Sequence, residues 1–442
     1  MSDYQYLDLL GQINKKLDSK QRAVCCRTDN TIVAAGAGSG KTQVLATRFA
    51  WLVMSEHIRA PQILTLTFTK KAAGEMYERI YKTLSFFAQN PETPPAEKKR
   101  AQLALEEFSD THIQTLDSYC NSIVKQAANR YGIRPDFTAG GSDSFEDIKK
   151  LALPYVLKNK DRPCVQKYSQ AGQLEDFAYS ILAQAVSQYT TLADPEDFFV
   201  SKVDAQKEKL LEDWNVKIVN LGELLDIFGN DCKQALAAKG QNEYIAMSFA
   251  VFDMLSKIST SQTESFEIAK MCAGELYETL KKIFKMKFPK GGYTKNLQGS
   301  KKILREEFIE PIMPLCAYMA QIDETIDLYK MFDDFTALVN ASKRTSGNLT
   351  FADISELALK ILKEQEDILL QEQNAYEKIM IDEFQDNNAK NRDLLFLLNK
   401  TDGLDSEDGQ KLFFVGDEKQ SIYKFRGADV SVFNKLKSEL GP

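Results

Sequence analysis

The stretch Thr31-Ile32-Val33-Ala34-Ala35-Gly36-Ala37-Gly38-Ser39-Gly40-Lys41-Thr42 decides the fold of this chain. It opens with β-branched and small apolar residues, continues through glycines, and leads into a helical pattern that runs from Lys41 to about Glu56. The pattern predicts a strand from Thr31 to Ala35, then a loop and a helix. In that arrangement backbone N–H groups and the helix N-terminus point at one anion, and glycines allow it to approach closely. The sequence therefore predicts a phosphate-binding loop.

Within this loop, the residue types suit a bound nucleotide. We expect Lys41 to contact the β- and γ-phosphates and the hydroxyl of Thr42 to bind Mg²⁺. Ala35 stands where the Walker A pattern usually has its first glycine. The alternative, a glycine-rich turn without a ligand, is disfavoured by Gly-Lys-Thr between a strand and a helix. The predicted nucleotide-binding residues here are Ala35, Gly36, Ala37, Gly38, Ser39, Gly40, Lys41 and Thr42.

Further strand and helix patterns extend this unit into an α/β fold. An apolar run from Ile63 to Phe68 precedes a helical stretch from Lys70 to about Phe87, which ends near a Pro-rich linker at residues 91–95. Alternation of strand and helix predicts a parallel sheet with covering helices. The remaining strands are predicted at His112 to Leu116, Lys378 to Ile381 and Leu412 to Val415, and all of them can belong to one sheet.

Between about Gln126 and Thr345 the sequence changes to long helical patterns, for example Leu174 to Gln188 and Ala205 to Phe228. We expect an inserted helical domain over residues 126–345, so the sheet domain is discontinuous and consists of residues 1–125 and 346–442. The sequence leaves open whether this insertion only braces the sheet or also contacts DNA.

Composition sets broad limits. A chain of 442 residues is expected to form two domains. The sequence has no run of about 18 apolar residues and no signal-peptide pattern, which predicts a cytoplasmic protein that does not contact membranes. Seven cysteines without a C-x-x-C pair and two histidines argue against a zinc site or a disulfide framework. With a net charge of −7, any contact with nucleic acid requires a local groove.

An acidic pair follows the apolar run Lys378 to Ile381. Asp382 is suited to hold Mg²⁺, directly or through water, and Glu383 to position or activate the attacking water. Taken alone, an Asp-Glu pair after a strand is more often a solvated turn. Combined with a phosphate-binding loop in the same chain, it predicts catalysis.

A second polar segment, Gly416 to Asp429, follows the last strand. It brings Gln420, aromatic residues and cations to the carboxyl edge of the sheet, where ligands bind in open α/β folds. Aromatic side chains between Lys and Arg suit single-stranded nucleic acid, because any base can stack on a ring. The alternative is a surface turn with a buried tyrosine.

Several segments, in chain order, carry a resemblance to a known family. They are Leu17 to Arg22, Ala35 to Thr42, Leu64 to Met76, Thr115 to Cys120, Asp382 to Asp386 and Gly416 to Asp429. They look like the Q motif and motifs I, Ia, Ib, II and III of superfamily 1A helicases of the UvrD/Rep type, especially the RecB and AddA branch. The resemblance covers residues 1–138 and 349–442.

The resemblance implies a RecA-like P-loop domain 1A with an inserted helical domain 1B. It also implies an ATP-dependent DNA helicase or helicase-nuclease that uses ATP and Mg²⁺ and acts in repair or recombination. Such an enzyme is expected to translocate 3′ to 5′ on single-stranded DNA and to bind single/double-strand junctions. The resemblance further implies a possible AddB- or RecC-like partner subunit. By position, Gln21 would pair with adenine, and Gln420 would contact the γ-phosphate. The implied DNA-facing or coupling residues are Phe68, Thr69, Thr115, Ser118, Tyr423 and Arg426.

This sequence departs from the family pattern at three positions. Asp117 replaces the usual histidine of motif Ib, which puts a carboxylate where a phosphate contact is expected. Gln43 stands where UvrD-like proteins often have arginine. Phe425 stands where they often have tryptophan, and in this it matches the RecB and AddA branch.

Motifs IV, V and VI have no counterpart before Pro442, so we expect these residues alone to hydrolyse ATP poorly. A different hypothesis is a catalytically inactive nucleotide-binding module with a regulatory or scaffold role. A small-molecule P-loop kinase is disfavoured, because motifs Ia, Ib and III would then have no purpose.

A basic segment lies inside the predicted insertion. From Lys281 to Arg305 the sequence has nine Lys or Arg residues and no acidic residue, with aromatic residues between them and a predicted turn at residues 289–292. We expect it to contact the DNA backbone, mainly through Lys285, Lys287, Lys290 and Lys295. The alternative is a solvated basic face that pairs with Glu306, Glu307 and Glu310.

Overall fold

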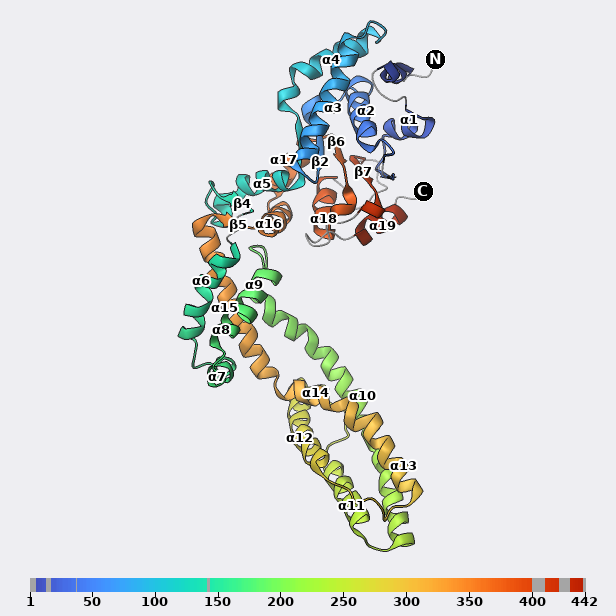
Figure 1. Cartoon of the computed structure of the whole chain (residues 1–442), viewed down its shortest axis with the longest axis vertical. Helices are drawn as coiled ribbons and strands as arrows, with labels where there is room; N and C mark the ends of the chain where they lie inside the picture. The colour runs from blue at the N-terminus through green and yellow to red at the C-terminus, as the bar shows by residue number, and fades with distance from the viewer. Residues whose placement is uncertain are drawn as a thin grey trace. The chain divides into compact units, whose positions relative to one another are not determined.

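The computed structural model describes residues 5–12, 17–36, 38–140, 144–399, 410–420 and 430–439. The chain divides into two compact units (Figure 1). The sheet unit consists of Met1–Ser144, Thr191–Ala193 and Ala341–Pro442, and the helical unit consists of Phe145–Thr190 and Asp194–Asn340. None of the helices in the described ranges is long and apolar enough to cross a membrane.

The sheet unit is built on five parallel strands in the order β1-β7-β6-β2-β3. They are β1 (Thr31–Ala34), β2 (Ile63–Thr67), β3 (His112–Thr115), β6 (Lys378–Ile381) and β7 (Leu412–Gly416). Each corresponds to a predicted strand, so the prediction of one parallel α/β sheet is confirmed. Because all the strands run the same way, the loops that follow them meet at one edge.

Helices cover both faces of this sheet, because the side chains of each strand alternate between two apolar cores. Ile379 and Ile381 pack into one core, whereas Met380 packs into the other. The first core includes α5 (Leu116–Ala127), α16 (Phe351–Glu364), α17 (Glu366–Ala375), α18 (Ala389–Leu398) and α19 (Val430–Glu439). The second includes α1 (Ser19–Cys25), α2 (Lys41–Met54), α3 (Lys70–Gln89) and α4 (Pro95–Glu106).

Several predicted boundaries move by one or two residues for local reasons. The predicted strand to Leu116 ends at Thr115, because the Thr115 hydroxyl accepts from the Ser118 amide and starts α5. The helix predicted to reach about Glu56 ends at Met54. The sequence did not predict the short parallel pair of β4 (Thr138–Ala139) and β5 (Asn348–Leu349), whose strands are too short to show periodicity.

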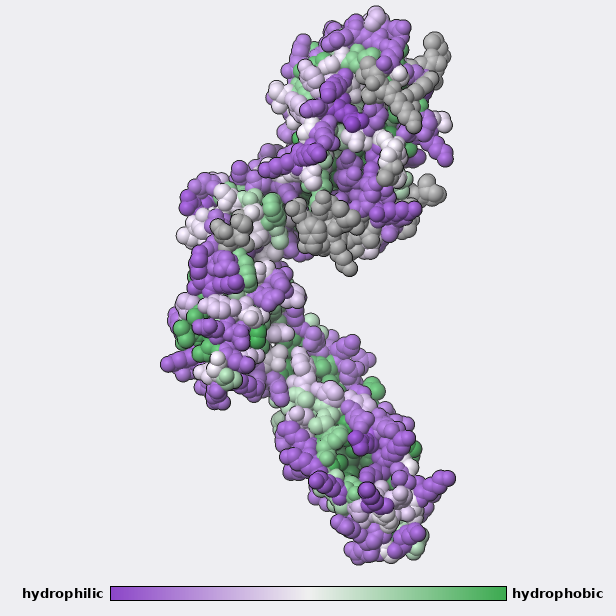
Figure 2. Space-filling model, viewed as in Figure 1, coloured by the Kyte–Doolittle hydropathy of each residue, from purple (hydrophilic) through white to green (hydrophobic). Residues whose placement is uncertain are grey.

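The helical unit contains two apolar cores of its own, in agreement with the long helical patterns of the middle sequence. The predicted helix at Leu174 to Gln188 is α8 (Leu174–Asp176), the π-helical η5 (Phe177–Ala183) and α9 (Gln184–Tyr189). The stretch Ala205 to Phe228 lies within α10 (Phe198–Lys239). The other helices are α6 (Ser144–Lys158), α7 (Pro163–Gln170), α11 (Glu243–Ser256), α12 (Phe266–Lys285), α13 (Lys295–Ile303), the π-helical η6 (Leu304–Ile309), α14 (Glu310–Ala320) and α15 (Ile322–Ser346). Figure 2 shows a largely hydrophilic surface with scattered hydrophobic patches on this face of the molecule.

Candidate nucleotide-binding site

The predicted phosphate-binding loop connects β1 to α2. Gly38 and Gly40 have φ angles of 71° and 81°, a conformation that side chains other than glycine rarely adopt. Gly40 is the N-cap of α2, which begins at Lys41 and has Thr42 in its first turn. Glycines at these positions thus bring the chain to the helix N-terminus, where amide dipoles favour an anion. Ala37 lies outside the described residues.

Lys41 is the point at which the predicted catalytic residues converge. Its Nζ lies 3.1 Å from Glu383 Oε2 and donates to Gln420 Oε1 at 3.2 Å. These residues follow β1, β6 and β7, which are neighbours in the sheet. The lysine side chain is 9% exposed and that of Glu383 is 32% exposed, so the ion pair is only partly shielded from water. The structure therefore brings together residues that are far apart in the sequence.

Asp382 lies at the end of β6 with its carboxylate buried. Its Oδ1 accepts from the backbone amide of Glu383 at 3.0 Å. Burial, reinforced by the negative charge of Glu383, raises the pKa of Asp382 to about 6, and Lys41 opposes this shift. Glu383 has a φ of 51°, the left-handed region, which is uncommon for a residue with a side chain. A buried carboxylate without a cation of its own fits a site that a divalent ion completes.

A cavity of about 330 Å³ adjoins the loop and is lined by Gln21, Ser39 and Lys41 among others. Gln21 belongs to α1, whose N-cap Asp18 forms a reciprocal capping box with it. The Gln21 side chain accepts from the Asp18 amide at 2.9 Å and donates to the Ser39 carbonyl at 2.8 Å. Each end of the amide thus makes one hydrogen bond, and because an amide can make a second bond at each end, these contacts do not prevent pairing with adenine.

Sequence reasoning missed Gln385, which holds two motifs together. Its Nε2 donates to Glu383 Oε2 at 2.8 Å, and its Oε1 accepts from the Asp417 amide at 2.8 Å. The residue is 1% exposed. A Cβ on Gly416 would lie 2.6 Å from Gln385 Oε1, which explains the glycine before Asp417. The available signal was an uncharged amide two positions after Glu383.

The predicted DNA-facing residues of the sheet unit occupy helix starts at the same sheet edge. The Thr69 hydroxyl caps α3 by accepting from the Ala72 amide, and the Thr115 hydroxyl caps α5 and contacts the Ser118 hydroxyl at 2.8 Å. Phe68 is half-buried between β2 and α3. Tyr423 and Arg426 lie outside the described residues. The structure thus gives these threonines a structural role, and a DNA contact stays a prediction.

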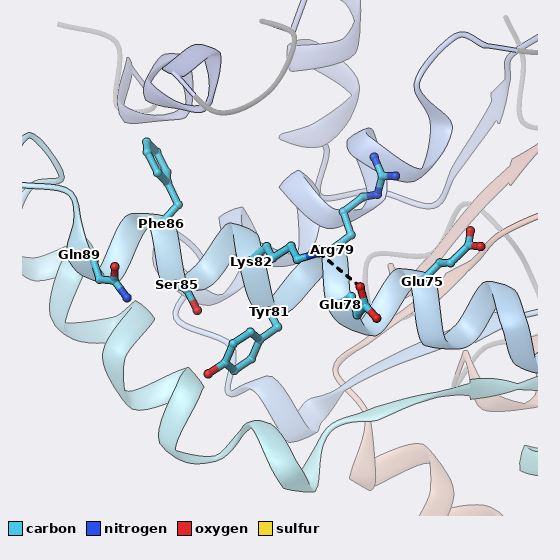
Figure 3. A pocket seen from close by; sticks show the side chains of 8 residues that line it. All are labelled: Glu75, Glu78, Arg79, Tyr81, Lys82, Ser85, Phe86 and Gln89. Atoms are coloured by element: carbon cyan, nitrogen blue, oxygen red, sulfur yellow. Dashed lines mark hydrogen bonds and ion pairs between the residues drawn. The ribbon is translucent and has the colours of Figure 1, made fainter.

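Another cavity, of about 660 Å³, lies elsewhere in the sheet unit. Figure 3 shows that the side chains lining it come from one helix, α3. Glu78 and Lys82 form an ion pair on this face at 3.3 Å. None of the residues predicted for catalysis or nucleotide binding lines this cavity, so its size does not mark the site.

A glycine-rich loop between a parallel strand and a helix, with an Asp-Glu pair on a nearby strand, defines a P-loop nucleotide-binding domain. More particularly, this chain belongs to the UvrD/REP helicase N-terminal domain family, whose pattern matches residues 17–441. The predicted family resemblance, with its AddA-like branch, is thereby confirmed.

Curated relatives agree with this family. The chain is 27% identical to an ATP-dependent helicase/nuclease subunit of Syntrophomonas wolfei, over 94% of this chain and 34% of that protein. It is 28% identical to exonuclease/helicase subunit RexA of Lactococcus lactis, over 96% of this chain and 37% of the relative. The corresponding helicase/nuclease protein of Clostridium beijerinckii is 24% identical, over 95% of this chain and 36% of the relative. The chain therefore spans about a third of the length of these relatives.

Proposed function

We propose that this chain is the ATP-binding motor domain of a DNA helicase or helicase-nuclease, which couples ATP hydrolysis to 3′ to 5′ translocation on single-stranded DNA during repair or recombination. The observation that carries the proposal is the convergence of Glu383 and Gln420 on Lys41 at 3.1 and 3.2 Å. The alternative of an inactive scaffold is not favoured, because both the phosphate-binding lysine and the glutamate suited to activate water are in place.

Each residue of the site has a proposed role in binding or hydrolysis. Lys41 exchanges its contact with Glu383 for the β- and γ-phosphates, because a bound phosphate attracts the ammonium more strongly than a single carboxylate does. Glu383 is then free to orient the attacking water and accept its proton. Gln385 keeps the Glu383 carboxylate in position. Gln420 contacts the γ-phosphate and couples its presence to DNA binding.

Asp382 and Thr42 are the residues that would hold Mg²⁺. The ion would neutralise charge that develops on the phosphates. Mg²⁺ usually takes one or two protein ligands and completes its shell with phosphates and water, so one carboxylate and one hydroxyl suffice.

The helical unit supplies a second proposed DNA contact. Of its basic segment, Lys281, Lys302 and Arg305 form ion pairs with Glu278, Glu306 and Glu310. These pairs agree with a solvated basic face for that part of the segment. The proposed phosphate contacts, Lys285, Lys287, Lys290 and Lys295, are exposed and carry charge that is available to DNA.

The turn between α12 and α13, which carries Lys287 and Lys290, is fixed by its own contacts. Asn242 Nδ2 donates to the Gly292 carbonyl at 3.0 Å, and Gly292 has a φ of 87°. The ammonium of Lys301 lies 3.0 Å from the centre of the Phe288 ring, a cation–π contact that joins α13 to the turn. Because the turn is held in place, its lysines form a defined surface rather than a flexible tail.

The relatives are named as subunits, and we propose that this chain also works with a partner subunit.

The proposed activity is tested by ATP hydrolysis with and without single-stranded DNA. In the full-length protein, Glu383→Gln should retain ATP binding and abolish DNA-stimulated hydrolysis, because an amide cannot act as a base. Lys41→Ala should instead weaken ATP binding itself. Near wild-type hydrolysis by Glu383→Gln would remove this glutamate from the mechanism.

A further inference from the structure

Helix α16 holds a short segment, Thr191–Ala193, which lies between α9 and α10 in the chain and which we call the return segment. Both of these helices belong to the helical unit, whereas the return segment belongs to the sheet unit. Leu192 is 4% exposed and packs into the same apolar core of the sheet unit as α16. The chain of the helical unit is therefore anchored in the sheet unit at a point between its two ends.

Polar side chains of α16 bind the return segment. The Leu192 amide donates to Asp353 Oδ1 at 3.0 Å, and the Lys360 ammonium donates to the Ala193 carbonyl at 3.1 Å. Asp353 is fully buried, and the ammonium of Lys343, near the end of α15, lies 2.9 Å from its Oδ2. A buried carboxylate is costly without such partners, so these contacts fix the return segment in place.

Glu356 connects the return segment to α18. Its Oε2 accepts from the Thr191 hydroxyl at 3.3 Å, and its Oε1 forms an ion pair with Lys390. Lys390 lies in the first turn of α18, just after the segment that carries the catalytic pair. Because Glu356 lies three positions after Asp353 and four before Lys360, the three side chains share one face of α16.

A second set of contacts runs from α16 to the peptide beside Glu383. The Ser355 hydroxyl donates to Asn391 Oδ1 at 3.1 Å, and Asn391 Nδ2 donates to Asn387 Oδ1 at 3.1 Å. Asn387 is buried, and its Nδ2 donates to the Phe384 carbonyl at 3.3 Å. The left-handed backbone of Glu383 persists only where surrounding contacts maintain it, so α16 helps to hold this glutamate in position.

We propose that α16 is a relay between the helical unit and Glu383, through which DNA bound by the helical unit accelerates ATP hydrolysis. The positioning residues on the side of the return segment are Asp353, Glu356 and Lys360, and the one on the side of Glu383 is Ser355. The inference rests on the proposed DNA function and adds a route of regulation to it. Because the hydrogen bonds and ion pairs are contiguous, a break at either side of α16 interrupts the relay.

The test measures ATP hydrolysis by the full-length protein with and without saturating forked DNA, and the stimulation is the ratio of the two rates. Lys360→Met removes a donor to the return segment and should lower the stimulation at least about threefold, with the basal rate unchanged. Lys360→Arg keeps a donor and should retain the stimulation. Lys363→Met makes the same change at an exposed position of α16 and is the matched control.

Ser355→Ala interrupts the relay on the side of Glu383 and should also lower the stimulation. In the double variant with Lys360→Met, the stimulation should be no lower than in the more affected single variant, because both changes interrupt one relay. Effects that multiply in the double variant, or an unchanged ratio in Lys360→Met even where both rates fall, would overturn the relay alone. A wild type whose hydrolysis DNA does not stimulate would overturn the proposed DNA function, and the relay with it.

Discussion

The guanidinium of Arg48 lies over the ring of Phe413, with 4.0 Å between its Cζ and the ring centre. Arg48 belongs to α2, the helix that follows the phosphate-binding loop, and Phe413 belongs to β7. The same guanidinium donates through Nη1 to the carbonyls of Cys25 and Arg27, at 3.0 and 2.6 Å. One buried side chain therefore links α1 and α2, which carry Gln21 and Lys41, to β7, the strand that precedes Gln420.

Arg48→Met should lower the free energy of unfolding by about 1–3 kcal/mol, because the carbonyls of Cys25 and Arg27 lose their buried donor. Desolvation lowers the pKa of Arg48 to about 10, so removing the charge offsets part of this loss. Urea unfolding measures the change. Arg79→Met, on the exposed face of α3, is the control and should have little effect. Equal stability of wild type and Arg48→Met would show that the contacts are energetically neutral.

Asp382→Asn should stabilise the protein at about pH 8 in the absence of Mg²⁺ and nucleotide. Because the fold raises the pKa of Asp382 to about 6, its contribution to stability is complete below the ordinary pKa of an aspartate and is lost as the pH rises through about 6. The neutral amide avoids this loss, which is on the order of 2–3 kcal/mol.

The corresponding measurement is urea unfolding of both proteins between about pH 4 and pH 8. The stability difference in favour of Asp382→Asn should grow across this range. Asp226→Asn, at an exposed position on α10, is the control for a lost carboxylate. A difference that is independent of pH would mean that burial does not penalise the Asp382 charge.

Gln385→Ala should reduce DNA-stimulated hydrolysis in the full-length protein by roughly 100-fold, because Glu383 loses the amide that orients it. The KM for ATP should change little, since Gln385 is not among the residues that line the cavity beside the loop. Steady-state kinetics separate the two quantities. Gln62→Ala removes another glutamine with a carboxylate partner, Glu377, and should leave both unchanged. A large rise in KM with an unaltered kcat would contradict a role in positioning Glu383.

Replacing Lys285, Lys287, Lys290 and Lys295 by Ala should weaken DNA binding on all sequences alike and reduce its dependence on salt. Each phosphate contact contributes about 0.9 to the slope of log affinity against log salt for duplex DNA, so the slope should fall by up to about 4. Forked DNA titrated at several salt concentrations gives the value. As a control, Lys281 and Lys302, both ion-paired, should have a smaller effect when replaced. An unchanged slope for the quadruple variant would identify the segment as a solvated surface.

Local sequence determined much of the sheet unit. The period of apolar residues places the strands, and Gly38 and Gly40 satisfy backbone conformations that can be inferred from their neighbours alone. The acidic pair after β6 was recognisable for the same reason, since the end of a parallel strand is a predictable place for a ligand. These features depend on residues a few positions apart.

The tertiary structure alone decided which of these residues meet. Lys41 and Glu383 are separated by 342 positions, and they meet because β1 and β6 both pair with β7 and end at the same edge of the sheet. Strand order depends on which apolar faces can be buried together, which no local pattern specifies. Arg48 and Gln385 escaped prediction because their partners are backbone groups and side chains of other segments, and only packing places those within hydrogen-bonding distance.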